Sequence, residues 1–253
     1  MRKVIEITSR DNPAVKHYLR LRDKKKYRQE EKLFIIEGLR IIRDALQYPY
    51  LVQQIFLTSK YEEEFQGAAG QIYRIPESIG KVMADTEHPQ GIFAVCRMSE
   101  QKQKLSSSGR YLVLCQLQDP GNMGMILRTC DALGVDGVFI TQCCDLYSPK
   151  AIRSTMGSVF RVPVTEVSSP EELLNLLRQN QITSYASVPS ENALKLTDCQ
   201  FQPGCAVWIG NEGNGLPEEI ISACQAITIP MKGGAESLNA AMAAGILLWE
   251  MRK

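Results

Sequence analysis

Past residue 110 the chain alternates short apolar runs with segments of helical spacing, and this alternation restricts the fold more than any other feature. Runs that are apolar throughout suit strands buried on both faces, and strands that alternate with helices form a parallel sheet covered by helices on both sides. Ligands of such sheets lie at the carboxyl ends of the strands. We therefore expect an α/β fold with its functional residues in the loops after strands. The expected strands are 111–117, 137–141, 182–188 and 205–209, and the expected helices are 123–133 and 171–179.

A separate unit is expected before residue 99. The stretch 99–110, SEQKQKLSSSGR, has one apolar residue in twelve and ends in a Ser/Gly cluster, which is typical of a linker. Upstream of it, Asn12 and Pro13 indicate the start of a helix, as cap and first-turn residue. Strands expected at 33–36, 54–57 and 92–96 alternate with helical stretches at 38–47 and 76–84. The sequence thus predicts a small α/β domain at 1–98, a linker at 99–110 and a larger α/β domain at 111–253.

Composition argues against several classes of protein. The eight cysteines include no Cys-x-x-Cys pair and the two histidines, His17 and His88, are isolated, so we expect no metal site and no histidine-based hydrolase. The longest apolar stretch, 238–249, includes Asn239 and is shorter than the roughly 20 residues that span a bilayer. The N-terminus has no apolar core of a secretory signal. We expect a cytoplasmic protein with reduced thiols and no membrane role.

Three loops carry unusual residues. The first, 118–124, crowds Asp, Pro, Gly and Asn ahead of a helix with Arg128 in its second turn. The second, 210–216, has three glycines in six residues, which lets backbone groups approach a ligand closely. It lacks the spacing of a dinucleotide or phosphate-binding loop, so a nucleotide-dependent transferase is disfavoured. The third, 229–239, leads into a helix of small residues that suits close packing.

In order, the three loops resemble the signature motifs of the SpoU-type branch of the SPOUT RNA methyltransferases, and the resemblance covers 111–253. The matching residues are Asp119-Pro120-x-Asn122-x-Gly124-x3-Arg128-Thr129, Gly210-Asn211-Glu212-Gly213-x-Gly215-Leu216 and Ile229-Pro230-Met231-x5-Ser237-Leu238-Asn239. The stretch 154–163 is also similar to the family's intervening stretch. Before the linker, Ser9-x2-Asn12-Pro13-x2-Lys16 and Phe34-x2-Glu37-Gly38 resemble a small substrate-binding domain of the ribosomal-protein L30e type.

The resemblance implies a catalytic domain with a trefoil knot, a homodimer, and S-adenosylmethionine bound at the knot. It implies methyl transfer to a ribose 2′-hydroxyl of ribosomal or transfer RNA, with the arginine of the first motif facing the partner's cofactor. By resemblance, the cofactor-binding residues are Gly210, Asn211, Gly213, Gly215, Ile229, Met231 and Leu238. The catalytic residues are Asn122, Arg128, Glu212, Ser237 and Asn239.

The residue types leave the proton acceptor open. An arginine is effectively always protonated, so Arg128 is better suited to stabilise a developing alkoxide and to hold a phosphate than to act as a base. Glu212 could accept the proton or orient Asn122 or Arg128. Alternatively it is a helix N-terminal charge ahead of Pro217. For Ser237 the alternative is a helix cap.

RNA binding requires positive charge, and the chain, at a net +1, concentrates it near the N-terminus. Residues 10–32 include nine basic and four acidic residues. His17, Tyr18 and Tyr27 add rings on which bases could stack. A solvated helix face is the alternative explanation. The expected RNA-binding residues are Arg10, Lys16, Arg20, Arg22, Lys24, Lys25, Lys26 and Arg28.

Other functions stay open at this stage. A non-catalytic RNA-binding or ribosome-associated protein would use both domains as a platform and would not need a cofactor pocket. Base methylation is an alternative within the wider superfamily. The target RNA, its nucleotide, and the choice between housekeeping modification and antibiotic resistance do not follow from the sequence.

Overall fold

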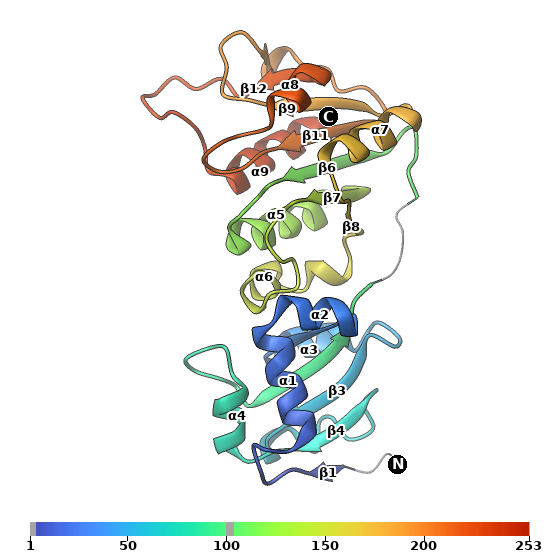
Figure 1. Ribbon diagram of the computed structural model, residues 1–253, viewed down its shortest axis with the longest axis vertical. Helices are drawn as coiled ribbons and strands as arrows, with labels where there is room; N and C mark the ends of the chain where they lie inside the picture. The colour runs from blue at the N-terminus through green and yellow to red at the C-terminus, as the bar shows by residue number, and fades with distance from the viewer. Residues whose placement is uncertain (1–3, 100–103, 253) are drawn as a thin grey trace. The chain divides into compact units, whose positions relative to one another are not determined.

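The computed structural model describes residues 4–99 and 104–252, which fall into two compact units (Figure 1). The first unit contains the residues up to 99 together with Tyr147–Phe160, and the second contains the remainder. Within the described ranges, no helix combines the length and apolar character needed to cross a membrane.

The first unit is built on a mixed sheet of five strands in the order β1-β4-β3-β5-β2. Strands β1, β3 and β4 run parallel, whereas β5 is antiparallel to both of its neighbours. Its strands are β1 (Ile5–Glu6), β2 (Leu33–Glu37), β3 (Val52–Leu57), β4 (Gln71–Arg74) and β5 (Ile92–Arg97). Its helices are α1 (Pro13–Asp23), α2 (Lys25–Glu31), α3 (Leu39–Ala45), η1 (Ser59–Tyr61) and α4 (Glu77–Met83).

Each face of this sheet carries its own apolar core. Successive side chains of a strand point to opposite faces, so neighbouring residues of one strand belong to different cores. In β2, Ile35 belongs to the core beneath α1 and α4, whereas Phe34 and Ile36 belong to the core on the other face. Helix α1 begins at the predicted cap, since the Asn12 side chain accepts a hydrogen bond from the N–H of Ala14 at 2.9 Å. The first unit is therefore an α/β fold with a core on each face of its sheet.

The structure differs from the predicted 111–253 domain in one segment. Residues Tyr147–Phe160, which include α6 (Pro149–Thr155) and η2 (Ser158–Phe160), pack with the first unit. Ile152 is buried in the first unit's core, and the Tyr147 and Phe34 rings lie 4.8 Å apart. Ile152 and the partly buried Tyr147, Val159 and Phe160 thus pack against the core of the first unit.

The predicted linker also differs from the structure at its C-terminal end. Residues 100–103 lie outside the described residues, but the part that follows belongs to the second unit. Leu105 packs against that unit's core, and the N–H of Ser106 donates to the Tyr111 hydroxyl at 2.7 Å. Arg110 is already the first residue of a strand.

The second unit contains a fully parallel sheet of seven strands in the order β10-β12-β9-β11-β6-β7-β8. Its strands are β6 (Arg110–Cys115), β7 (Gly137–Thr141), β8 (Val164–Glu166), β9 (Thr183–Ser187), β10 (Leu194–Lys195), β11 (Cys205–Ile209) and β12 (Gln225–Thr228). Its helices are α5 (Pro120–Leu133), α7 (Pro170–Gln179), η3 (Leu196–Asp198), α8 (Glu218–Ala223) and α9 (Ala240–Met251). The parallel sheet predicted from the alternating pattern is confirmed.

The strand order reverses between β6 and β11. From β6 the chain proceeds to β7 and β8 on one side, and the later strands occupy the other side. Ligands of open parallel sheets bind at such a reversal, outside the carboxyl ends of the strands. The loops after β6 and β11, which are the first two unusual loops of the sequence, are therefore neighbours.

Several predicted element boundaries were wrong by one to three residues, and the structure gives the reason for two of them. Helix α5 begins at Pro120 rather than residue 123, because the Asp119 carboxylate accepts from the N–H of Asn122 at 2.8 Å and caps the helix. The expected strand 111–117 ends at Cys115, because the backbone of Gln116 turns into the left-handed region with φ +60°.

Helices α1 and α2 correct three expectations about RNA contacts. Arg28 is buried, and its guanidinium donates to the carbonyl oxygens of Leu21 and Arg22 at the end of α1. Arg22 donates to carbonyl oxygens at the C-terminus of α4, including that of Ala84 at 3.0 Å. Tyr18 is fully buried in the core. These three side chains hold the helices in place and are not placed for RNA binding.

Replacing Arg28 should therefore destabilise the fold. Arg28→Met leaves the last carbonyl groups of α1 without their buried charged donor, and we expect a loss of about 2 to 4 kcal/mol in the free energy of unfolding. The matched Lys25→Met, at an exposed position of the same helix, should change it by less than about 0.5 kcal/mol. Urea unfolding followed by circular dichroism measures both, and equal stability of the two variants would contradict the structural role of Arg28.

Candidate active site

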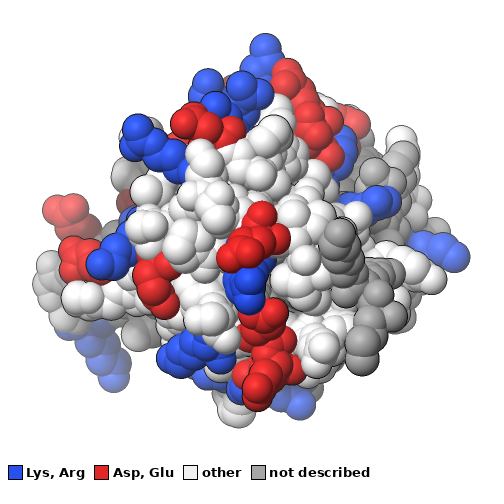
Figure 2. Space-filling model, turned by 90° about the horizontal axis from the view of Figure 1, so that it is seen from below, with Lys and Arg blue, Asp and Glu red and all other residues white. Residues whose placement is uncertain are grey.

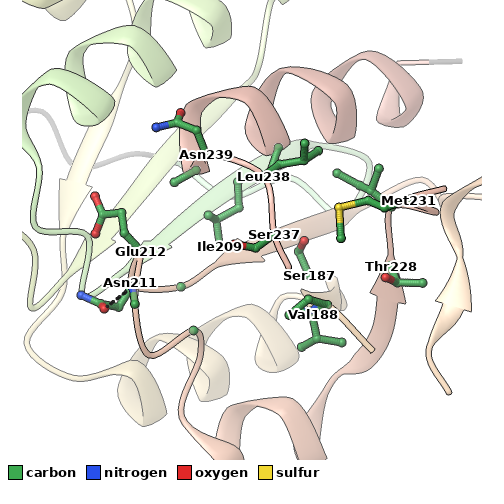
Figure 3. A pocket seen from close by; sticks show the side chains of 17 residues that line it. Ser187, Val188, Ile209, Asn211, Glu212, Thr228, Met231, Ser237, Leu238 and Asn239 are labelled. Carbon is green, nitrogen blue, oxygen red and sulfur yellow. Dashed lines mark hydrogen bonds between the residues drawn. The ribbon is translucent and has the colours of Figure 1, made fainter. Parts of the chain in front are cut away.

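A cavity of about 320 Å³ lies at the carboxyl ends of β9, β11 and β12 and is bordered by the start of α9 (Figure 3). Every residue that the sequence predicts to bind the cofactor lines it, and so do three of the five predicted catalytic residues. The predicted cofactor residues in its wall are Gly210, Asn211, Gly213, Gly215, Ile229, Met231 and Leu238, and the predicted catalytic residues there are Glu212, Ser237 and Asn239.

The glycine-rich loop after β11 closes on itself. Asn211 and Gly215 exchange backbone hydrogen bonds of 2.9 and 3.0 Å, and the Asn211 side-chain oxygen accepts from the N–H groups of Gly213 and Asn214 at 2.9 Å. A Cβ at Gly210 would lie 2.2 Å from the carbonyl carbon of Gly215. Only glycine fits there, because a side chain would push the two ends of the loop apart.

A chain of hydrogen bonds joins the three motif loops. One oxygen of Glu212, in the second motif, accepts from the Asn122 side chain at 3.0 Å, and Asn122 lies in the first motif. The Asn122 side-chain oxygen in turn accepts from the Asn239 amide of the third motif at 3.0 Å. Asn239 caps α9 by accepting from the N–H of Ala241 at 2.9 Å. Residues far apart in the sequence are thus fixed at one end of the sheet.

Glu212 is held as an anion. Its carboxylate also accepts from the backbone N–H groups of Gln118 and Asp119, both at 3.1 Å. Partial desolvation raises the pKa of Glu212, but the hydrogen bonds from Asn122 and these two backbone groups outweigh it and lower the pKa below its ordinary value. A carboxylate with a lowered pKa is a weak base, so the geometry favours the orienting role of Glu212 over proton acceptance.

These contacts do not support the alternative interpretations, in which Glu212 is a helix N-terminal charge and Ser237 is a helix cap. Helix α8 starts at Glu218, and the Glu212 carboxylate bonds to the first motif loop instead. Asn239, and not Ser237, caps α9. Ser237 is exposed and lines the cavity.

Part of the cavity wall was missing from the sequence prediction. The end of β9 contributes Ser187, the loop after it contributes Val188 and Pro189, and the end of β12 contributes Thr228. Figure 3 shows Ser187, Val188 and Thr228 in the wall. The strand at 182–188 was predicted, and its carboxyl end meets the same edge of the sheet as the glycine-rich loop. The position of this strand end, at the same edge as the glycine-rich loop, could have pointed to these residues. Their residue types alone are not unusual.

Arg128 is placed differently from the other predicted catalytic residues. Its side chain is exposed on α5, does not line the cavity, and makes no hydrogen bond or ion pair with another side chain of residues 4–99 and 104–252. Helix α5 packs against α9, which is apolar on nearly all sides. The exposed apolar residues of the two helices are Met125, Met242, Ile246 and Trp249, which are 54%, 61%, 37% and 57% exposed.

Six of the eight predicted RNA-binding residues are exposed. Lys16 pairs with Asp11 at 2.8 Å, and the Arg20 guanidinium lies 5.9 Å from the centre of the Tyr27 ring. His17 shares a hydrogen bond of 2.9 Å with the Tyr27 hydroxyl. Figure 2 shows basic and acidic side chains interspersed on the face it displays, rather than one continuous basic surface. The exposed six are Arg10, Lys16, Arg20, Lys24, Lys25 and Lys26.

Neither metal ligands nor disulfides contribute to the described parts of the chain. No group of three or more His, Cys, Asp or Glu side chains there is placed to hold a metal ion, and all eight cysteines are free thiols. Burial raises the pKa of Cys143 and Cys224 to about 11, so these thiols are protonated at neutral pH.

Comparison with known proteins agrees with this geometry. Residues 109–249 match the family model described as the SpoU rRNA Methylase family, and residues 12–94 match an MRM3-like substrate binding domain. A 23S rRNA (guanosine(2553)-2′-O)-methyltransferase of Bacillus subtilis is 32% identical over 98% of this chain and 99% of its own length. A 23S rRNA (uridine(2479)-2′-O)-methyltransferase of Streptomyces viridochromogenes is 28% identical over 96% of this chain and 90% of its own length.

Among solved structures, an AdoMet-bound rRNA methyltransferase from Sinorhizobium meliloti superposes with a TM-score of 0.89 at 28% identity, covering 98% of this chain and 97% of its own. The family model covers more than half of the chain and includes all three motif loops. The resemblance found in the sequence is thereby confirmed, and the chain belongs to the SpoU rRNA methylase family.

Proposed function

We propose that this protein transfers a methyl group from S-adenosylmethionine to a ribose 2′-hydroxyl of ribosomal or transfer RNA. The observation that carries the proposal is the joining of the three motif loops at one cavity through Glu212, Asn122 and Asn239. The predicted enzyme class and cofactor are confirmed by the comparisons. A non-catalytic RNA-binding protein would have no need of this cavity.

The cavity fits the cofactor in size and chemistry. About 320 Å³ is within the usual range for small-molecule sites, and the wall combines apolar side chains with exposed backbone groups of a glycine-rich loop. Ile229, Met231 and Leu238 would contact the adenine and the apolar parts of the cofactor, and the loop 210–215 would bond its polar edges. S-adenosylmethionine supplies an electrophilic methyl group on its sulfonium.

The protein's own task is to position the ribose and to stabilise the charge that develops on its 2′-oxygen. The Glu212 network fixes both Asn122 and Asn239: Asn239 lines the cavity, and Asn122 is held beside it by its bonds to Glu212 and Asn239. Arg128 would stabilise the alkoxide and hold the adjacent phosphate through its planar fork of donors. Glu212 orients Asn122 and does not accept the proton. The 2′-hydroxyl proton would pass to solvent water as the oxygen–methyl bond forms and the methyl–sulfur bond breaks.

A homodimer would bring Arg128 to an active site. Met125 precedes Arg128 by about one turn of α5, and α9, which packs against α5, carries the other exposed apolar residues. An exposed apolar surface of this kind is typical of a subunit interface. We propose that each subunit's Arg128 faces the partner's cavity and that the segment 229–239 forms the trefoil knot of the family.

We also propose that the first unit binds RNA, that its boundary with the catalytic domain lies near residue 100, and that the protein acts in the cytoplasm.

The proposed reaction is tested by incubating the protein with ribosomal and transfer RNA and methyl-labelled S-adenosylmethionine, then hydrolysing the RNA in alkali. Alkaline cleavage requires a free 2′-hydroxyl, so 2′-O-methylation yields labelled dinucleotides that resist cleavage. Label in mononucleotides would indicate base methylation and contradict the proposal. Mapping 2′-O-methyl sites in cells with and without the gene then identifies the nucleotide.

Glu212→Gln should lower kcat by about 10- to 100-fold. The single NH2 group of the glutamine would face either the N–H of Gln118 or the donors of Asp119 and Asn122, so at least one bond is lost. The bonds that remain lose their charged acceptor, so Asn122 would be held less firmly. The matched Glu218→Gln, at an exposed position in the first turn of α8, should leave kcat unchanged.

The pH profile separates the two roles of Glu212. Because its pKa is lowered in the folded protein, the contribution of its charge is complete above the ordinary value of 4.5 and is lost only as the pH falls below it. The profile of kcat between pH 6 and 9 should therefore contain no ionisation that disappears in Glu212→Gln. An ionisation in this range that the substitution removes would indicate that Glu212 is the base.

Subunit mixing tests whether Arg128 acts across the dimer. Arg128→Ala should abolish activity, and so should Leu238→Arg, because it places a charge in the wall of the cavity that binds a sulfonium. After co-expression of the two inactive chains, heterodimers contain one complete site, and activity should recover to about a quarter of the wild-type value. No recovery, with heterodimers verified by affinity tags, would place Arg128 at its own subunit's site.

Reversing the charge at Lys24, Lys25 and Lys26 should weaken RNA binding by about tenfold or more, and should reduce the slope of log affinity against log salt by about 2. The matched triple substitution of the exposed Lys60, Lys81 and Lys195 changes the net charge equally, and we expect it to have a much smaller effect. Filter binding over a range of salt concentrations measures both, and equal losses would mean that net charge alone matters.

A further inference from the structure

Two adjacent strands of the parallel sheet end in the same unusual way. Immediately after β6, Gln116 has φ +60°, and immediately after β7, Gln142 has φ +54°. Residues other than glycine rarely adopt this left-handed conformation, and it persists where surrounding contacts hold it. Neither glutamine lines the cavity, and neither belongs to the three motifs.

Backbone hydrogen bonds run in both directions between the two turns. The N–H of Gln116 donates to the carbonyl of Thr141 at 2.9 Å, and the N–H of Cys144 donates to the carbonyl of Leu117 at 2.8 Å. Between these bonds, the Gln116 side chain donates to that of Gln142 at 2.9 Å. The loops after β6 and β7 are thus tied together on both sides of the turn.

The left-handed turn points the carbonyl group of Gln116 toward the glycine-rich loop. The Gln116 carbonyl oxygen accepts from the Asn211 side chain at 2.9 Å and from the Gln118 side chain at 3.1 Å. Asn211 is the residue whose side-chain oxygen binds the N–H groups of Gly213 and Asn214. The orientation of the Asn211 amide, and with it the shape of the glycine-rich wall, therefore depends on the backbone at Gln116.

We propose that Gln116 is a positioning residue for the cofactor site, and that it acts through its left-handed backbone carbonyl rather than through its side chain. The inference rests on the proposed function only in taking S-adenosylmethionine as the ligand of the cavity.

Three substitutions separate the backbone from the side chain. Gln116→Val disfavours the left-handed turn, because a β-branched residue with positive φ is strained, whereas Gln116→Gly permits the turn without the side chain. Gln181 is the matched control, since it is a glutamine of the same unit with φ +59° that does not line the cavity. Gln181→Val carries the same local strain away from the site.

Isothermal titration with S-adenosylmethionine should show about tenfold weaker binding for Gln116→Val, and binding within about threefold of wild type for Gln116→Gly and Gln181→Val. The two valine variants should have similar melting temperatures. Equal affinity of Gln116→Val and wild type would overturn the proposal. So would a loss in Gln116→Gly as large as that in Gln116→Val, because the side chain would then be the active part.

Hydrogen exchange of the cofactor-free protein is a measurement that does not depend on ligand binding. The amides of Gly213 and Asn214 should exchange faster in Gln116→Val than in wild type, Gln116→Gly or Gln181→Val. Unchanged protection in Gln116→Val would overturn the proposal. If wild type fails to bind S-adenosylmethionine while the exchange pattern holds, the proposed function fails and the positioning role of Gln116 stands.

Discussion

The carboxylate of Glu212 is the group on which the arrangement of the site depends. It accepts three hydrogen bonds from the first motif loop, and two of them come from backbone N–H groups that no side-chain substitution removes. Hydrogen bonds to a charged group are stronger than those between neutral groups. One side chain in the glycine-rich loop therefore fixes the loop after the neighbouring strand, and through Asn122 it also fixes Asn239 at the start of α9.

This arrangement requires the parallel sheet. The loops after β6 and β11 are about 90 residues apart in the sequence, and the bond between Asn122 and Glu212 spans 90 positions. They become neighbours because the strand order reverses between these two strands. The cavity lies beside this point, at the ends of β9, β11 and β12, so the cofactor pocket and the residues proposed to act on the ribose share one rigid edge.

The sequence predicted the parts of the molecule that depend on pattern. Apolar runs located the main strands, and the cap at Asn12 located the first residue of α1. The three motifs located a cavity that all seven predicted cofactor residues line. Short strands such as β8 and β10 were missed because they contain too few residues to establish a period.

Other features depend on tertiary contacts and leave no local trace. A run of basic residues does not reveal that Arg28 is buried against the end of α1 or that Arg22 caps α4. The segment Tyr147–Phe160 lies within the stretch that resembles the catalytic domain, yet its apolar residues pack with the first unit. The left-handed turn at Gln116 occurs in a residue type that rarely adopts it, so composition gave no sign of it.

S-adenosylmethionine is proposed to bind in the cavity built from loops that the sheet brings together. Hydrogen exchange of the wild-type protein with and without S-adenosylmethionine tests it most directly. Binding in this cavity should slow exchange in three separate segments, 187–189, 209–215 and 228–239, and leave exchange in the first unit unchanged. Protection that is absent from these segments, or that appears in the first unit instead, would contradict it.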